Sequence, residues 1–285
     1  MTTQDKFNEL TAKLISTIEN GNVGDWLKPF RSSGRIPSNF STHKRYRGLN
    51  VLFLWMIAQE EGYKSNYWLT FNQVVAMGGT VKKGSLATPI FFFKFLDIKE
   101  ENDLGEIEQK HIPMMKTFNV FNLDQTTLEL DKVNTNNEVI PEIETFIAAT
   151  NATIKAGSEA YYHTANDFIA MPDLGMFESE EHYYSTLLHE LSHWTGHASR
   201  LDRDMEGTFG SESYAFEELI AELSSCFLNA ELGIDYTQMR HAEYLQSWLK
   251  ALKANPKTLW KAASQAQKAA DFIMSFSNMK EEDAA

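Results

Sequence analysis

The sequence predicts an α+β protein made of two parts, and three observations support this expectation. The first 130 residues mix helical periodicity with the alternating apolar pattern of an antiparallel sheet. Residues 142–285 are mainly helical, with one small sheet. The polar stretch ELDKVNTNNEVIPEI, centred near residue 135, favours turns and offers little to anchor a core, as in a linker. We therefore expect one domain over residues 1–130 and a second over residues 142–285.

The predicted first domain begins with a helix in QDKFNELTAKLISTIENG, where apolar residues recur at helical spacing and Asn20 and Gly21 supply a stop. RGLNVLFLWMIAQEEGY predicts a second, more buried helix that ends at Gly62. The apolar runs TPIFFFKFLDI and IPMMKTFNVFNLDQT follow, and they predict strands of an antiparallel sheet.

The predicted second domain has a short sheet in AYYHTANDFIAMPD and helices after it. Ser179 can cap the first of these helices, and Glu180 and Glu181 suit its first turn because acidic side chains there favour the helix dipole. Gly196 marks its end. SESYAFEELIAELSSCFLNAELG predicts a helix that stops at Gly233. Two more are expected in TQMRHAEYLQSWLKALKA and KTLWKAASQAQKAADFIMSF, and the EEDAA tail is expected to fray.

Charge is divided unevenly along the chain. The net charge is -13, yet residues 1–95 hold 12 Lys and Arg against 6 Asp and Glu, and the remaining residues hold 14 against 33. Because screening limits the reach of distant charges to about 10 Å, the basic first third can still attract a polyphosphate.

Other features predict a cytoplasmic protein, expected to be a monomer without a membrane partner. MTTQDKFNEL lacks the basic and apolar pattern of a secretory signal, and the apolar runs are too short to cross a bilayer as helices. The single cysteine, Cys226, has no disulfide partner within the sequence and is expected to be a buried small hydrophobe.

The stretch LLHELSHWTGH contains H-E-x-x-H at residues 189–193. On a helix, residues four apart lie one turn above each other, so the imidazoles of His189 and His193 can reach one cation. Glu190 then stands beside the first ligand, where it can take a proton from water as a general base. The surrounding leucines can bury the motif, which favours a metal site over a purely structural role.

A hydrolytic zinc site has three protein ligands, so one more must come from elsewhere in the chain. Glu218 begins an E-x-x-A-E pattern in FEELIAELSS, and placed as in thermolysin-like zincins it would be the third ligand. Glu222, one turn on, would then orient a ligating imidazole. Glu217 is a rival that points about 100° away around the helix. His197 is another, although the helix is expected to end before it. The donor set favours zinc and also accepts manganese or cobalt.

The predicted reaction is hydrolysis of a peptide bond, which also needs a hydrogen-bond donor for the tetrahedral intermediate. Tyr214 lies four residues before Glu218 on the same helical face and is the first candidate, with His182 second. NDFIAMP is expected to form an edge strand along the cleft, where it could pair with an extended peptide.

The first third combines basic and aromatic residues in a pattern suited to single-stranded nucleic acid, because cations follow the phosphates and bases stack on flat rings. Such residues also occur simply as core aromatics or solvated charges, so the pattern alone leaves both interpretations open. The predicted DNA contacts are Lys44, Arg45, Tyr46 and Arg47 in NFSTHKRYRGLN, Trp68 with its neighbours Tyr67 and Phe71 in NYWLTFNQ, and Lys82 and Lys83 in TVKKGS.

Several segments together resemble the ArdC-type antirestriction proteins of plasmids and phages. They are WLKPF, PSNFSTHKRYRGLNVLFLW, YWLTFNQVVAMGGTVKKGS, DFIAMP, HELSHWTGHASRLDRD and FGSESYAFEELIAELSS. These proteins are similar in their N-terminal part to TraC-type DNA-transfer primases. The resemblance implies an N-terminal domain that binds single-stranded DNA and a C-terminal zincin-like, gluzincin-type metallopeptidase domain. It also implies His189, His193 and Glu218 as ligands and Glu190 as the base.

The leading hypothesis is an antirestriction protein of a mobile element that binds single-stranded DNA and hydrolyses a peptide bond, in a host restriction-system protein or another substrate. The alternative is a protein that shields single-stranded DNA by occupancy and whose metal is structural. A third hypothesis is a metallopeptidase whose first domain binds protein.

Overall fold

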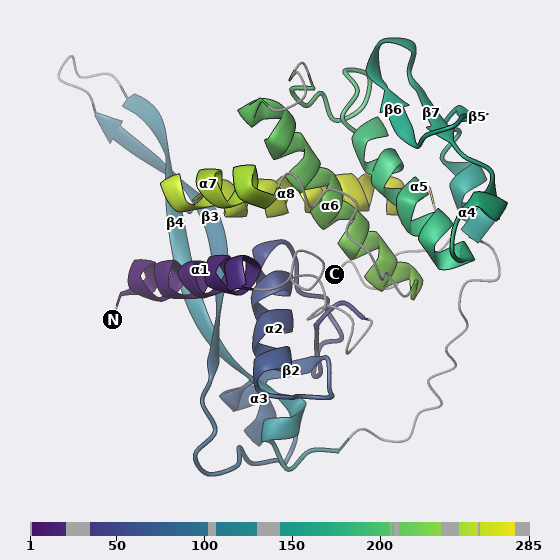
Figure 1. Cartoon of the computed structure of the whole chain (residues 1–285). Helices are drawn as coiled ribbons and strands as arrows, with labels where there is room; N and C mark the ends of the chain where they lie inside the picture. The colour runs from purple at the N-terminus through teal and green to yellow at the C-terminus, as the bar shows by residue number, and fades with distance from the viewer. Residues whose placement is uncertain are drawn as a thin grey trace.

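The computed structural model describes residues 2–20, 35–101, 107–129, 143–205, 207, 211–234, 245–255 and 257–276. The linker predicted near residue 135, the domain boundary within it and the EEDAA tail lie outside these residues. Within them, the predicted α+β class is confirmed: helices and a sheet come first, and a mainly helical part with a small sheet follows (Figure 1).

The first part contains a four-stranded sheet in the order β1-β2-β4-β3, in which β1 and β2 are parallel and the other pairs antiparallel. The two longest strands, β3 and β4, form a ribbon that projects beyond the helices (Figure 1). The helices and strands of the first part are α1 (Thr3–Asn20), β1 (Ser38–Asn39), α2 (Leu49–Glu60), β2 (Tyr67–Thr70), α3 (Phe71–Ala76), β3 (Thr88–Glu101) and β4 (Ile107–Asn122).

Helix α2 is apolar on every side, as expected of a helix buried all round. The Asn50 side chain ties it to the sheet, because its Nδ2 donates to the Phe91 carbonyl and its Oδ1 accepts from the Phe91 N–H, both at 2.8 Å. The basic stretch that precedes α2 forms a loop next to the short strand β1. Backbone hydrogen bonds from Asn39 to Lys44 and from Tyr46 to Pro37, both at 2.8 Å, hold this loop at the edge of the sheet.

The second part has a three-stranded sheet in the order β5-β7-β6 and packed helices. Helix α5 begins as predicted, because the Ser179 side chain accepts a hydrogen bond from the His182 N–H. Helix α6 ends as predicted at Gly233, whose φ of 69° lies in the left-handed region. The elements are α4 (Ile143–Ala149), β5 (Ile154–Ala156), β6 (Tyr161–His163), β7 (Phe168–Met171), α5 (Glu180–Trp194), α6 (Glu212–Leu232), α7 (Leu245–Ala254) and α8 (Lys257–Met274).

The expectation that NDFIAMP forms an edge strand is wrong. Its strand, β7, lies in the middle of the small sheet, parallel to β5 on one side and antiparallel to β6 on the other. The sequence does not reveal this position because β5 is three exposed residues long and shows no alternation. The edge strands of this sheet are thus β5 and β6.

Buried side chains from both parts form one hydrophobic cluster. Trp55 of α2 packs against Phe227 of α6, with ring centroids 6.2 Å apart, and Cys226 is buried as expected. Among the described helices, none is both long and apolar enough to span a membrane. The shared core holds α5 and α6 side by side, which positions the H-E-x-x-H motif.

Candidate metal centre and nucleic-acid cleft

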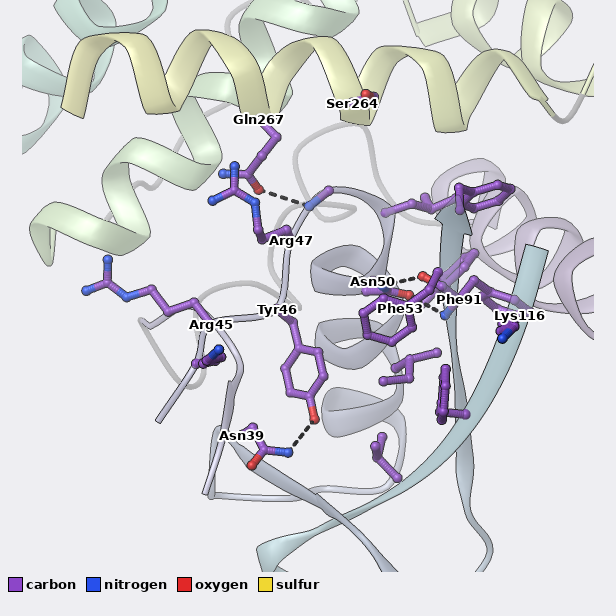
Figure 2. Close-up of a pocket in the computed structure, with 18 of the residues that line it drawn as sticks. Asn39, Arg45, Tyr46, Arg47, Asn50, Phe53, Phe91, Lys116, Ser264 and Gln267 are labelled. Atoms are coloured by element: carbon purple, nitrogen blue, oxygen red, sulfur yellow. Dashed lines mark hydrogen bonds between the residues drawn. The ribbon is translucent and has the colours of Figure 1, made fainter. Parts of the chain in front are cut away.

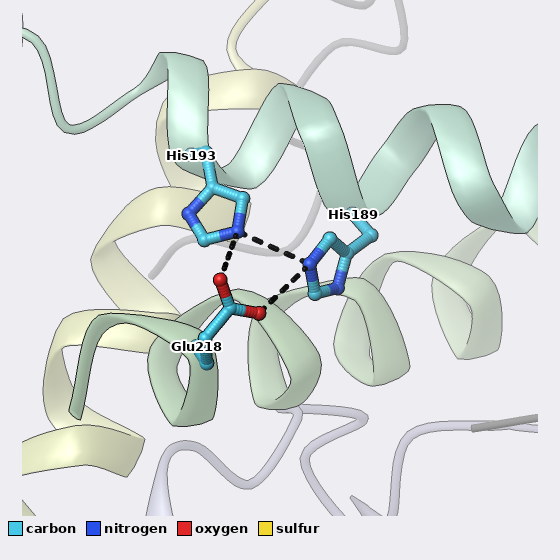
Figure 3. A group of neighbouring side chains, drawn as sticks. All are labelled: His189, His193 and Glu218. Atoms are coloured by element: carbon cyan, nitrogen blue, oxygen red, sulfur yellow. Dashed lines mark hydrogen bonds and ion pairs between the residues drawn. The ribbon is translucent and has the colours of Figure 1, made fainter. Parts of the chain in front are cut away.

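Helices α5 and α6 bring three side chains of the predicted metal site together (Figure 3). The Nε2 atoms of His189 and His193 lie 3.1 Å apart. Glu218 presents Oε2 to His189 Nε2 at 3.6 Å and Oε1 to His193 Nε2 at 3.5 Å. One ligand atom from each residue lies within 4.8 Å of the others, and all three residues are buried.

This geometry fits a divalent cation. Bonds of about 2.0–2.2 Å in a tetrahedron place neighbouring ligand atoms about 3.4 Å apart, close to the separations found here. The two imidazole Nε2 atoms face each other at 3.1 Å. In the neutral form that binds a metal, both atoms are acceptors, so both can bind a cation placed between them.

The neighbouring Glu217 approaches His193 from its Nδ1 side rather than its Nε2 side, in keeping with its 100° offset from Glu218. It accepts hydrogen bonds from Arg203 at 2.6 and 2.9 Å, and His193 Nδ1 lies 3.2 Å from its Oε1. A carboxylate on Nδ1 fixes the imidazole tautomer that leaves Nε2 free to bind a metal. Glu222 lies near His189, with Oε1 3.7 Å from Nδ1, which is longer than a hydrogen bond.

Arg203 was not predicted from the sequence. Its side chain is 5% exposed, and besides Glu217 it donates to the Ser192 carbonyl and to Thr195 Oγ1. It therefore joins the end of α5 to α6 next to the predicted ligands. No spacing rule marks such an arginine, because the turn that carries it has no helical periodicity.

Charges inside the centre shift its acid–base equilibria. Burial lowers the pKa of His193, but the nearby Glu218 charge and hydrogen bonds to Glu217 and Glu218 outweigh it and hold that pKa well above its usual value. Burial raises the pKa of Glu218, yet His193 and His189 together bring it well below the usual range for a carboxyl. The carboxylates of the centre therefore favour positive charge at the neighbouring imidazoles.

A cavity of about 260 Å³ opens over His189, His193 and Glu218. Glu190 and Tyr214, the residues predicted as base and hydrogen-bond donor, line it together with these three predicted ligands. His182, the second candidate donor, packs instead against the Phe177 ring with centroids 5.3 Å apart. His197 lies beyond the end of α5, where its ring nitrogen is 2.8 Å from Ser199 Oγ, outside the ligand group.

A larger cleft, of about 1060 Å³, lies against the basic loop (Figure 2). Lys44, Arg45, Tyr46 and Arg47 all line it. The Tyr46 ring is largely buried, and its hydroxyl accepts a hydrogen bond from Asn39 Nδ2 at 3.4 Å. Four of the predicted DNA contacts are therefore brought to one place.

The other predicted DNA contacts lie elsewhere. Trp68 is fully buried, so its ring has no exposed face on which a base could stack, and the expectation for this residue is corrected. The sequence could not distinguish the two faces of its short strand. Lys82 donates to the Asp124 carbonyl at 2.8 Å, and Lys83 is exposed beside it; neither lines the cleft.

Comparison with known proteins gives two family matches. Residues 4–121 match the N-terminal domain of anti-restriction factor ArdC, and residues 141–265 match a zincin-like metallopeptidase domain. The antirestriction ArdC protein from plasmid R388 has a metal-free crystal structure that is 40% identical, with a TM-score of 0.79 over 95% of this chain and 97% of that one. Its Mn(II)-bound structure is 39% identical, with a TM-score of 0.78 over 96% and 99%.

Two curated relatives extend the comparison. An uncharacterized protein of Sinorhizobium fredii is 35% identical over 95% of this chain and 92% of its own length. The DNA primase TraC of Escherichia coli is 38% identical over 95% of this chain, which spans only 20% of the primase.

Proposed function

This chain belongs to the ArdC family of antirestriction proteins, and we propose that it combines capture of single-stranded DNA with metal-dependent hydrolysis of a peptide bond. The observation that carries the hydrolytic part is the convergence of His189, His193 and Glu218 on one point, with Glu190 in the same cavity. The domain matches at residues 4–121 and 141–265 support a domain boundary between residues 130 and 142.

The proposed metal ligands are His189, His193 and Glu218, with Glu217 and Glu222 holding the two imidazoles in the tautomer that exposes Nε2. Zinc suits two nitrogen donors and one carboxylate, and manganese or cobalt also fits them. The crystal structure of the R388 relative with Mn(II) supports a divalent cation in this family. A cation in such a site polarises a carbonyl oxygen and makes water more acidic.

Glu190 is proposed to take a proton from the attacking water and to deliver it to the leaving nitrogen. Its side chain is buried at the cavity that the ligands line, which keeps it next to the reacting atoms. Tyr214, on the first turn of α6, is proposed to donate a hydrogen bond to the oxygen that becomes negative during attack.

A peptide substrate can be held by the edge strand β6, which takes the place that the sequence had suggested for β7. Tyr161 and Tyr162 of β6 line the cavity over the ligands, and the outer edge of β6 is unpaired within the described sheet. An extended peptide could add to this edge through main-chain hydrogen bonds, which would lay its carbonyls across the centre.

For the first part of the chain, we propose that the basic loop binds the phosphates of single-stranded DNA through Lys44, Arg45 and Arg47. The three cations lie on one cleft, and the family match for residues 4–121 supports a role in DNA binding. The alternative function, shielding of DNA with a structural metal, uses the same loop and differs only in what Glu190 does.

Glu190→Gln separates the two functions. The amide cannot act as a base, while Glu190 is not a proposed ligand, so metal content and DNA affinity should stay as in the wild type. The measurement is the survival of unmodified DNA entering a restricting host. Loss of protection with both bindings intact supports hydrolysis, whereas full protection supports shielding.

The DNA-binding proposal is tested by the double reversal Arg45→Glu and Arg47→Glu. Fluorescence anisotropy of a labelled oligothymidylate should show weaker binding and a shallower dependence on salt, because fewer phosphate counterions are released. Unchanged affinity and salt slope would remove the loop from the DNA-binding surface.

A further inference from the structure

The large cleft has walls from both parts of the chain. The basic loop and α2 form one side, β3 and β4 another, and α8 crosses over them (Figure 2). The Gly48 N–H donates to Gln267 Oε1 of α8 at 2.9 Å, which fixes the loop against that helix. On the ribbon side, the rings of Phe93 and Trp260 lie 4.6 Å apart. Helix α8 therefore closes the cleft at two points.

The cleft is strongly basic although the chain as a whole carries -13. Its lining contains five basic side chains and one acidic, Asp271. Three of the basic residues belong to the loop, while Lys116 comes from β4 and Lys268 from α8. A polyanion lying along the cleft would thus meet positive charge on all three walls.

The same cleft exposes aromatic rings. Phe92 and Phe93 of β3 and Phe118 of β4 are 51%, 39% and 47% exposed, and a group of exposed apolar side chains often marks a binding site. All three line the cleft together with Trp260. Rings that bases can stack on, set among cations that can follow phosphates, are the combination that single-stranded DNA needs.

We propose that α8 is the second wall of the single-stranded-DNA site, so that DNA held by the basic loop also contacts Trp260 and Lys268. This inference rests on the proposed DNA-binding function and extends it from the first part of the chain to the peptidase part. Lys268 meets a phosphate, and Trp260 with Phe93 provides a surface for a base.

Two ion pairs hold the arginines of the basic loop at the cleft. Arg45 pairs with Glu231 at 2.7 Å, and Arg47 pairs with Asp271. The Arg47 pair is exposed on both sides, at 62% and 42%, and ion pairs this exposed contribute little stability, so Arg47 can exchange Asp271 for a phosphate. Arg45 is 52% exposed, so its guanidinium can reach a phosphate while it keeps Glu231, which is only 15% exposed, as a partner.

The first test is Lys268→Glu in the full-length chain, with Lys155→Glu as its matched control. Both lysines are exposed, but Lys155 lies on β5 in the small sheet and does not line the cleft. Anisotropy with a labelled oligothymidylate should give roughly tenfold weaker binding for Lys268→Glu, with a salt slope lower by about one. Lys155→Glu should bind as the wild type does.

The second test addresses stacking at Trp260. Trp260→Leu should weaken oligothymidylate binding severalfold, and the loss should persist at high salt because stacking is not screened. Trp260→Phe retains a ring and should restore most of the affinity. Thermal unfolding of both variants checks that the fold is retained, and Lys268→Glu decides the matter if Trp260→Leu does not fold.

The outcomes distinguish this inference from the proposal on which it rests. If Lys268→Glu and Trp260→Leu bind like the wild type while reversal of Arg45 and Arg47 weakens binding, α8 is no wall of the site and the DNA-binding function stands. If the wild type itself binds no oligothymidylate, both fail.

Discussion

Neighbouring glutamates on α6 have different surroundings, and this difference decides their roles. Glu218 faces the two Nε2 atoms, whereas Glu217 lies between Arg203 and His193 Nδ1. The two sites are separated by one peptide unit and by a rotation of about 100°. Substitution at each therefore tests a separate part of the centre.

We expect Glu218→Gln to abolish stoichiometric metal binding and Glu217→Gln to weaken it by about 10–100-fold. The first change removes a proposed ligand, while the second weakens only the hydrogen bond that orients an imidazole. Elemental analysis gives metal content, and competition with a chelator gives affinity. The reverse order of effects would identify Glu217 as the ligand.

At the scale of single residues, the sequence predicts side-chain positions where these depend only on spacing along one helix. His189, Glu190 and His193 lie one turn apart or side by side, so their placement follows from the helix alone. The burial of Trp68 and the hydrogen-bond partners of Arg203 could not be predicted, because both depend on segments distant in the sequence. The choice between Glu217 and Glu218 needed the packing of α5 on α6.

At the scale of elements, an ion pair joins the small sheet to the turn that follows α5. Arg200 pairs with Asp167, and its guanidinium also lies over the Trp194 ring at 4.0 Å from the centroid. The Arg200 hydrogen bond holds the pKa of Asp167 below its usual value in spite of burial. The same contacts position β6, the proposed peptide-binding edge, because Tyr162 of β6 donates to Asp167 at 2.8 Å.

Asp167→Asn should lower the stability at pH 7 by about 1 kcal/mol or less, since the pair is partly exposed. Because the folded pKa of Asp167 is lowered, its contribution is present above the usual Asp pKa of about 4 and is lost as the pH falls through the folded value. Thermal unfolding at pH 7 and at pH 3 should show the difference between wild type and variant shrinking in acid.

The Asn variant is the suitable control for the backbone. Asp167 has a φ of 48°, in the left-handed region, which Asn adopts at least as readily as Asp. A difference that stays constant from pH 7 to pH 3 would mean that the Asp167 charge contributes nothing.

Elements with strong local signals were predictable, and those set by distant pairing were not. The cap at Ser179 and the stop at Gly233 marked α5 and α6 in the sequence. Strand β5 carries no pattern of its own and is defined by β7, so the order of the small sheet could not be derived. Likewise, nothing in the sequence of α8 indicates that it faces a loop more than 200 residues earlier.

At the scale of the molecule, one core joins the two parts. Trp55 and Phe227 are both buried and meet across the boundary between α2 and α6. The domain division predicted from the linker therefore coexists with a shared interior. Cooperative unfolding is the expected consequence.

Phe227→Ala should destabilise the chain by about 3–5 kcal/mol, because it leaves a cavity in this core. Denaturant unfolding followed by tryptophan fluorescence and by circular dichroism should shift together, in a single transition. Phe71→Ala, at a side chain that is 54% exposed, should stay within about 0.5 kcal/mol of the wild type. Two separate transitions, with only one of them shifted, would show that the parts unfold independently.

Helix α6 also sets a distance. Glu218 lies near its start and Glu231, the partner of Arg45, near its end, 13 residues later and about 20 Å along the axis. If the chain binds DNA and hydrolyses peptides as proposed, a protein bound to the same DNA strand would be tethered near the proposed hydrolytic centre, at an effective concentration on the order of millimolar. Attachment to the DNA would then select the substrate, and the proposed peptide-binding edge would need little sequence preference.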